Sequence, residues 1–113
     1  MIKSLEQIRK KLSVDYLVSM NQQKIVNSNQ SIRSFREGIY QNFNYKCVYC
    51  GSLAQSLDHA KPKAKGGETV ASNLLPACLP CNRDKGSQEL FAWYRARYYW
   101  TQEREAAIAN WIN

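Results

Sequence analysis

The chain is 113 residues long, enough for one domain with a modest core. Its composition, 44% hydrophobic and 22% charged, excludes collagen and coiled coil and argues against intrinsic disorder. No apolar stretch approaches the ~18 residues of a membrane span, and the charged first segment lacks the apolar region of a secretory signal. We therefore expect a cytoplasmic protein with a single domain over residues 1–113 and no membrane partner.

The net charge points to a polyanionic partner. Sixteen Lys and Arg residues against nine Asp and Glu residues give a formal charge of +7. A basic surface on so small a protein concentrates polyanions around it, and nucleic acid is the commonest of these. Many basic proteins bind nothing in particular, so the charge favours a nucleic-acid partner without identifying one.

The first half of the chain is predicted to be mostly helical. Apolar residues at three- and four-residue steps predict a short helix over residues 1–12 and a second over 31–43, with Gly38 as the weak point of the second. A mixed or loosely ordered connector is expected over 13–28. Leucines at even spacing within residues 51–59 then suggest a strand or a hairpin arm.

Helix signals return in the last third of the chain. A helical segment is expected after Cys81, up to a break at Gly86. Ser87 is a candidate N-cap for a further helix, with Glu89 in its first turn, and Thr101 is a candidate N-cap for the last helix. The aromatic residues of this region could stack on bases, but we expect most of them to pack in the core.

Four cysteines form two C-x-x-C pairs with 27 residues between them. Two residues between thiolates let a tight turn present both sulfurs to one ion at about 2.3 Å. Disulfide frameworks belong to oxidising compartments, to which nothing directs this chain. Free or redox-active cysteines are the alternative. The pattern predicts a tetrahedral structural zinc site, without an open position for substrate, on Cys47, Cys50, Cys78 and Cys81.

The single histidine, His59, follows Asp58 at the end of the expected strand. A lone histidine is ordinarily a surface or core residue, but the context of this one differs. A basic loop with two glycines comes directly after it, and Asn82 is attached to a cysteine of the predicted zinc site. The zinc would therefore fix the start of the Asn82 segment relative to the strand, as a preorganised site requires.

These segments resemble the HNH nucleases, whose active unit is a ββα-metal motif, or His-Me finger. The matching runs are C-x-x-C, L-D-H-A-K-P-K-A-K-G-G, S-N-L-L-P-A-C and L-P-C-N-R-D-K-G, over about residues 47–86. The third position of the pattern is Asn82, so the chain looks like the H-N-N variant. The resemblance implies an α+β fold with this core at 46–86, between helical flanks at 1–45 and 87–113.

The resemblance also implies a role for each matching residue. His59 would activate water as the general base, since an unperturbed imidazole is mostly neutral at pH 7. Asp58 and Asn82 would hold one Mg²⁺ or Mn²⁺ ion that stabilises charge on the scissile phosphate. Asn73 would hydrogen-bond the loop and keep the strand of His59 in place. The implied activity is metal-dependent endonucleolytic cleavage of DNA, most readily double-stranded, leaving 5′-phosphate and 3′-hydroxyl ends.

Basic residues flank the expected site. Proline, paired glycines and alternating lysines predict a loop over residues 61–67. Its lysines, and two basic residues after Cys81, are candidate phosphate contacts, although each could equally belong to an ordinary solvated surface. These candidate contacts are Lys61, Lys63, Lys65, Arg83 and Lys85.

Two questions stay open at this point. Neighbouring residues of a regular strand point to opposite faces, so Asp58 and His59 can serve one phosphate only if the strand ends, bulges or twists there. The cysteine pairs, the charge and the aromatic residues also fit a zinc-stabilised nucleic-acid-binding module without catalysis. The Asp58–His59 pair together with Asn82 favours the nuclease, because a binding module needs no base and no second set of ligands.

Overall fold

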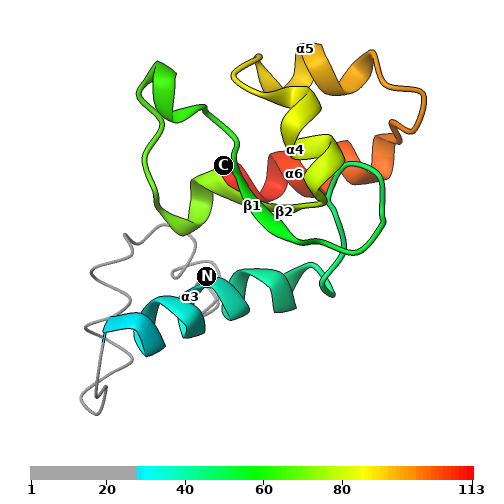
Figure 1. The fold of residues 1–113 in the computed structure, drawn as a ribbon. Coiled ribbons are helices and arrows are strands. Elements are labelled where there is room, and N and C mark those ends of the chain that lie inside the picture. The colour runs from blue at the N-terminus through cyan, green and yellow to red at the C-terminus, as the bar shows by residue number, and fades with distance from the viewer. Residues whose placement is uncertain (1–27) are drawn as a thin grey trace, which may run out of the picture.

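The computed structural model of the protein describes residues 28–113, and it is a small α+β arrangement (Figure 1). The helix predicted over 1–12 and the connector over 13–28 lie outside this range, apart from Ser28. The elements in chain order are helix α3 (Ser28–Asn42), strand β1 (Ser56–His59), the short 3-10 helices η1 (Lys63–Lys65) and η2 (Ala71–Asn73), strand β2 (Leu74–Ala77), and helices α4 (Leu79–Lys85), α5 (Leu90–Arg95) and α6 (Gln102–Ile112).

Strands β1 and β2 form a two-stranded antiparallel sheet. Ser56 pairs with Ala77 at one end and His59 with Leu74 at the other, with each intervening residue in register. The strand expected within residues 51–59 is therefore confirmed, although it occupies only the last four of them. The regular pairing sends successive side chains to opposite faces, so that Ser56 and Asp58 face α4, whereas His59 faces α3.

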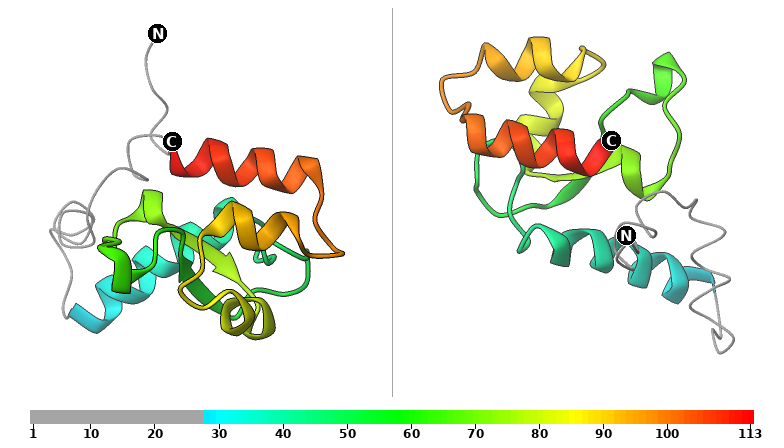
Figure 2. Two further views of the ribbon diagram at one scale, coloured as in Figure 1. Left: turned by 90° about the horizontal axis from the view of Figure 1, so that it is seen from above. Right: turned by 180° about the vertical axis from the view of Figure 1, so that it is seen from behind.

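The sheet lies between α3 on one side and α4, α5 and α6 on the other (Figures 1 and 2). On the α3 side, Phe35 and Ile39 pack four residues apart on the helix against Ala71 and Leu74. The indole of Trp111 donates hydrogen bonds to the carbonyls of Ala71 and Leu74, at 2.9 and 3.0 Å, and so ties α6 to the same cluster. The helix predicted over 31–43 is confirmed as α3.

The larger core contains the cysteines and most of the aromatic residues. Tyr49 is fully buried and meets Trp93 and Tyr94 edge to face, with ring centroids 4.9 and 5.3 Å apart. The expected packing role of the C-terminal aromatic residues therefore holds for these two, whereas Tyr98 is almost completely exposed. Within residues 28–113, no helix combines the length and apolar character needed to cross a membrane.

The helix ends agree with the sequence signals except at α5. Helix α4 ends before Gly86, which has a φ of +54°, and the Thr101 hydroxyl caps α6 by accepting from the backbone N–H three residues later. The prediction of Ser87 as the N-cap of α5 is wrong. Residues 86–88 continue the turn that follows α4, and Glu89 is the cap, because its carboxylate accepts from the Ala92 N–H at 2.6 Å.

Candidate functional site

The four cysteine sulfurs lie within 4.8 Å of one another, and all four are free of disulfides. The sulfurs of Cys50 and Cys78 are 3.7 Å apart. Two thiolates that each lie about 2.3 Å from one zinc ion, at a tetrahedral angle, would be separated by about 3.8 Å. The cluster is therefore positioned to bind a metal ion and is compatible with a zinc site.

Backbone amides support the cluster from both cysteine pairs. The Tyr49 N–H points at the sulfur of Cys47, and the Cys81 N–H points at the sulfur of Cys78, each at 3.4 Å. Cys78 is also the N-cap of α4. An ion bound here would thus fix the start of the helix that carries Asn82.

The thiols differ in their tendency to ionise. Burial alone would raise the pKa of Cys50, but hydrogen bonds from the side chain and backbone of Ser52 lower it to about 7. Burial raises the pKa of Cys47 and that of Cys81. A bound cation favours the thiolate form of every ligand, so metal binding here would release protons.

A buried ion pair occupies the α4 side of strand β1. Asp58 is only 4% exposed, and its Oδ2 accepts a 2.5 Å hydrogen bond from the Tyr49 hydroxyl. The Lys85 ammonium lies 3.2 Å from Oδ2 and 3.3 Å from Oδ1 of the same carboxylate. It also donates to the backbone carbonyl of His59 at 3.0 Å. Lys85 therefore joins α4 to two consecutive residues of β1.

The protonation of this network follows from its burial. Burial raises the pKa of Asp58, whereas the Tyr49 hydroxyl and the Lys85 ammonium oppose the rise. Burial and the nearby Asp58 carboxylate raise the pKa of Tyr49 well above its ordinary value, so Tyr49 remains a neutral donor. Lys85 does not fit the predicted role of a phosphate contact. Its side chain is fully buried and paired, so it does not face a phosphate in solution.

Asn82 lies on the same side of the strand. Its Nδ2 donates to the Ser56 hydroxyl oxygen at 2.9 Å, and the Ser56 hydroxyl donates in turn to the Ala77 carbonyl at 3.0 Å. Helix α4 thus brings Asn82 and Lys85 to the face of β1 that carries Ser56 and Asp58. The structure collects the predicted carboxylate and carboxamide on one face.

His59 faces the other way. Its half-buried imidazole shares a cavity of about 320 Å³ with residues of α3, and its Nε2 lies 3.0 Å from the Thr69 hydroxyl oxygen. Burial lowers the pKa of His59, as do the nearby Lys63 and Lys85, while Asp58 opposes them. The imidazole is therefore neutral at pH 7. Strand β1 is regular up to His59 and ends there, so this side chain and that of Asp58 leave opposite faces of the strand.

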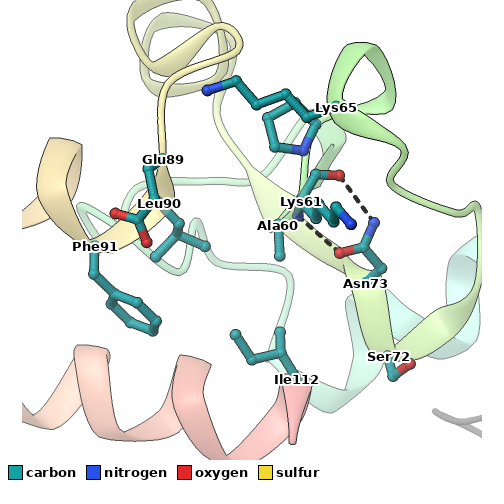
Figure 3. Close-up of a pocket in the computed structure, with 10 residues that line it drawn as sticks. Ala60, Lys61, Lys65, Ser72, Asn73, Glu89, Leu90, Phe91 and Ile112 are labelled. Atoms are coloured by element: carbon teal, nitrogen blue, oxygen red, sulfur yellow. Dashed lines mark hydrogen bonds between the residues drawn. The ribbon is translucent and has the colours of Figure 1, made fainter.

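Asn73 closes the loop that follows β1. Its Oδ1 accepts from the Lys61 N–H at 2.8 Å, and its Nδ2 donates to the Lys61 carbonyl at 3.1 Å (Figure 3). The same Nδ2 also donates to the Glu68 carbonyl at 2.9 Å. Its own carbonyl accepts from the Ala60 N–H. A Cβ at Gly67 would lie only 1.8 Å from the Lys61 carbonyl oxygen, so the closed loop requires glycine there. These are contacts of a residue that holds the loop against the strand.

The remaining predicted phosphate contacts lie at the surface. The first three belong to the loop after β1, and the fourth belongs to α4. These exposed residues are Lys61, Lys63, Lys65 and Arg83.

Comparison with known proteins places this arrangement in a family. Residues 47–88, which contain all four cysteines, both strands and α4, match the family model described as HNH endonuclease. This segment belongs to the HNH endonuclease family. The HNH segment is preceded by α3 and followed by α5 and α6.

Two bacterial proteins are similar to part of this chain. One is a Bacillus subtilis protein with the name "SPbeta prophage-derived putative HNH endonuclease YoqL". It is 31% identical over 84 residues, covering 63% of this chain and 36% of the relative. The CRISPR-associated endonuclease Cas9 of Corynebacterium diphtheriae is 36% identical over 58 residues, covering 47% of this chain and 5% of the relative. The chain thus spans about a third of the first relative and a twentieth of the second.

Three residues around the HNH segment were not singled out from the sequence. Tyr49 lies inside the first C-x-x-C pair and binds Asp58, and Thr69 follows the Gly-Gly loop and binds His59. Arg36 lies on α3 and lines the cavity of His59. A hydroxyl residue two positions after the glycine pair is a usable signal for Thr69, whereas the positions of the other two depend on tertiary packing.

Proposed function

We propose that the protein is a metal-dependent endonuclease that hydrolyses phosphodiester bonds of double-stranded DNA, with His59 as the general base. One observation carries the proposal. The single histidine stands at the end of the HNH strand, in a cavity, and burial lowers its pKa. A neutral imidazole within reach of solvent is what abstraction of a proton from water requires.

Thr69 sets which imidazole nitrogen acts as the base. If the Nε2–H of His59 donates to the Thr69 hydroxyl oxygen, 3.0 Å away, Nδ1 carries the lone pair. Nδ1 then takes a proton from water, the water oxygen bonds to phosphorus, and the bond from phosphorus to the 3′ oxygen breaks. The leaving oxygen takes a proton from solvent water to give the 3′-hydroxyl, the phosphate stays on the 5′ end, and Nδ1 returns its proton to solvent.

Two metal ions belong to the proposal. The four thiolates would hold a structural Zn²⁺, and the sulfur spacing fits that ion. Asp58 and Asn82 would hold the catalytic Mg²⁺ or Mn²⁺, and their oxygen atoms are of the type that these hard cations prefer. Asp58 and His59 leave opposite faces of β1, so the proposal requires the phosphate to lie at the end of the strand, directly after His59, where such an ion would stabilise its negative charge.

The existing contacts of Asp58 and Asn82 decide which of their oxygen atoms could bind the ion. Asn82 donates through Nδ2 to Ser56, which leaves its Oδ1 as the ligand atom. Both oxygens of Asp58 lie close to the Lys85 ammonium, so a divalent ion would share this carboxylate with Lys85. Asp58 and Asn82 fit a Mg²⁺ or Mn²⁺ ion because both offer oxygen ligands.

The exposed basic residues give the DNA its place on the protein. Lys61, Lys63, Lys65 and Arg83 would contact backbone phosphates, which position a duplex without reading its sequence. The net charge of +7 supports such a surface. We propose that the protein acts inside a bacterial or phage-infected cell, as suits the prophage-derived relative.

The test is cleavage of supercoiled plasmid with Mg²⁺, with Mn²⁺ and without a divalent ion. Wild type should cleave only with an added ion, and His59→Ala should lower the rate by about 10²- to 10⁴-fold. The variant should keep its metal content and thermal transition, because the imidazole belongs to neither buried cluster. Equal cleavage by His59→Ala overturns the mechanism. DNA binding with no cleavage under any ion replaces the nuclease with a nucleic-acid-binding module.

A further inference from the structure

The cavity on the α3 side of β1 combines residues from inside and outside the HNH segment. It holds three polar side chains, His59, Thr69 and Arg36, of which the last comes from α3. The rest of its lining is apolar and consists of Ile32, Phe35, Leu57 and Leu74. A cation, a neutral base and a hydroxyl thus line one cavity with otherwise apolar walls.

Packing holds Arg36 at this cavity. Its neighbour Phe35 is 7% exposed and packs with Ile39 against Ala71 and Leu74, which fixes the rotation and position of α3. Ile32, one turn before Arg36, lines the same cavity. The backbone of Arg36 is therefore as firmly placed as the buried face of its helix.

The guanidinium of Arg36 has no carboxylate partner within residues 28–113, where the ion pairs are formed by Lys85, Arg95 and Arg97. The adjacent carboxylate of Glu37 accepts a 2.6 Å hydrogen bond from the Tyr45 hydroxyl instead. Arg36 is also exposed, so its charge faces solvent at the cavity. An arginine used for stability would be expected to pair, as Arg95 and Arg97 do.

We propose that Arg36 binds the nonbridging oxygens of the DNA phosphate that enters the cavity beside His59. This inference rests on the proposed nuclease function and adds a substrate-binding residue to it. The planar guanidinium offers parallel N–H donors that match two phosphate oxygens. The apolar walls suit the sugar that flanks the phosphate, and Lys63 adds positive potential at His59. Helix α3 thereby completes the substrate site of the HNH segment.

Arg33 supplies a matched control. It lies three residues earlier on α3, is exposed and carries the same charge, but it does not line the cavity. Arg36→Gln and Arg33→Gln therefore change the overall charge and its attraction for DNA equally. We expect Arg36→Gln to lower kcat/KM for plasmid cleavage by about 10-fold or more, and Arg33→Gln by no more than about 2-fold. Arg36→Lys should recover part of the loss, because it keeps the charge but not the paired donors. Equal losses in the two glutamine variants overturn the proposal.

A binding measurement separates this inference from the proposed function. The chain has one histidine, so the NMR signals of its imidazole report on the cavity directly. Duplex DNA is added to purified protein that retains its bound metal, without Mg²⁺ or Mn²⁺. The imidazole signals should shift in wild type and in Arg33→Gln, and much less in Arg36→Gln. That pattern supports phosphate binding by Arg36 even if no cleavage is seen, which would refute only the nuclease. Equal shifts in all three proteins refute the role of Arg36.

Discussion

The two faces of strand β1 have opposite characters although their residues alternate along four positions. The face toward α4 carries Asp58, which is buried and bound by Tyr49 and Lys85. The face toward α3 carries His59, which lines a cavity and contacts Thr69. One face is a closed network of charge and hydrogen bonds, and the other is open to a cavity.

This difference shows how a very small domain can keep a histidine both fixed and accessible. The Lys85 ammonium donates a hydrogen bond to the backbone carbonyl of His59 from the closed face. This contact holds the backbone of His59 without using the imidazole nitrogens, of which Nε2 contacts Thr69. The two faces predict different outcomes: a change on the closed face should alter stability first, and one on the open face should alter activity alone.

The largest effect is expected from Cys78→Ser, which should disrupt both faces. Serine is itself a good N-cap, so the substitution keeps the cap of α4 and removes one metal ligand. We expect loss of the bound metal and destabilisation by several kcal/mol, because binding energy at such a site is folding energy. Metal analysis and thermal unfolding measure this. A full complement of zinc in the variant would contradict a four-cysteine site.

Lys85→Met should damage the closed face. The substitution leaves the Asp58 carboxylate buried without its cation, which typically costs about 3–5 kcal/mol. Denaturant unfolding measures the loss, and Lys65→Met, at an exposed position, should change stability by less than about 0.5 kcal/mol. Adding Asp58→Asn to Lys85→Met should restore part of the stability. If the single variant is as stable as wild type, the ion pair does not hold α4 to β1.

Thr69→Val should affect only the open face. Valine keeps the shape but removes the hydroxyl that orients the imidazole of His59. The loss of one such hydrogen bond predicts a fall in kcat of up to about 10-fold with an unchanged thermal transition. Nitrogen NMR of the single histidine should show a changed tautomer balance, which a purely structural role of Thr69 would not produce. The exposed Ser87→Ala is the control, and an unchanged tautomer balance in Thr69→Val would remove Thr69 from the mechanism.

Local sequence patterns correctly predicted the paired cysteines and two of the helix ends. The paired cysteines, the break at Gly86 and the cap at Thr101 depend on neighbours within a few residues, and the structure has them. The N-cap of α5 was missed because Ser87 and Glu89 are both able to cap, and the turn after α4 decides between them. Such signals predict features that are decided within about one helical turn of sequence.

What the sequence could not predict depends on residues brought together from afar. Lysine is almost never fully buried, so nothing in the sequence indicated that Lys85 lies in the interior. Its burial follows from its meeting with Asp58, 27 positions earlier. Likewise, Arg36 reaches the cavity of His59 only because α3 docks on β2. The alternation of a strand does predict that Asp58 and His59 diverge, but not which face is open.

The smallest effect is expected from the charge around the open face, and it is measured as the pH dependence of kcat/KM. Burial and then Lys63 lower the pKa of His59 from its ordinary 6.5. In the proposed mechanism the neutral imidazole is the active form, so kcat/KM should fall as the pH drops through a midpoint below 6.5. Lys63→Gln removes a repelling cation and should raise the pKa of His59, which moves this midpoint to higher pH. Lys65→Gln is the matched control, because Lys65 is not among the charges that act on His59. An NMR titration of the single histidine gives the same pKa without any need for cleavage. A midpoint that responds equally to both lysine substitutions would show that only the overall charge matters, and the distinction between the two faces would lose its electrostatic support.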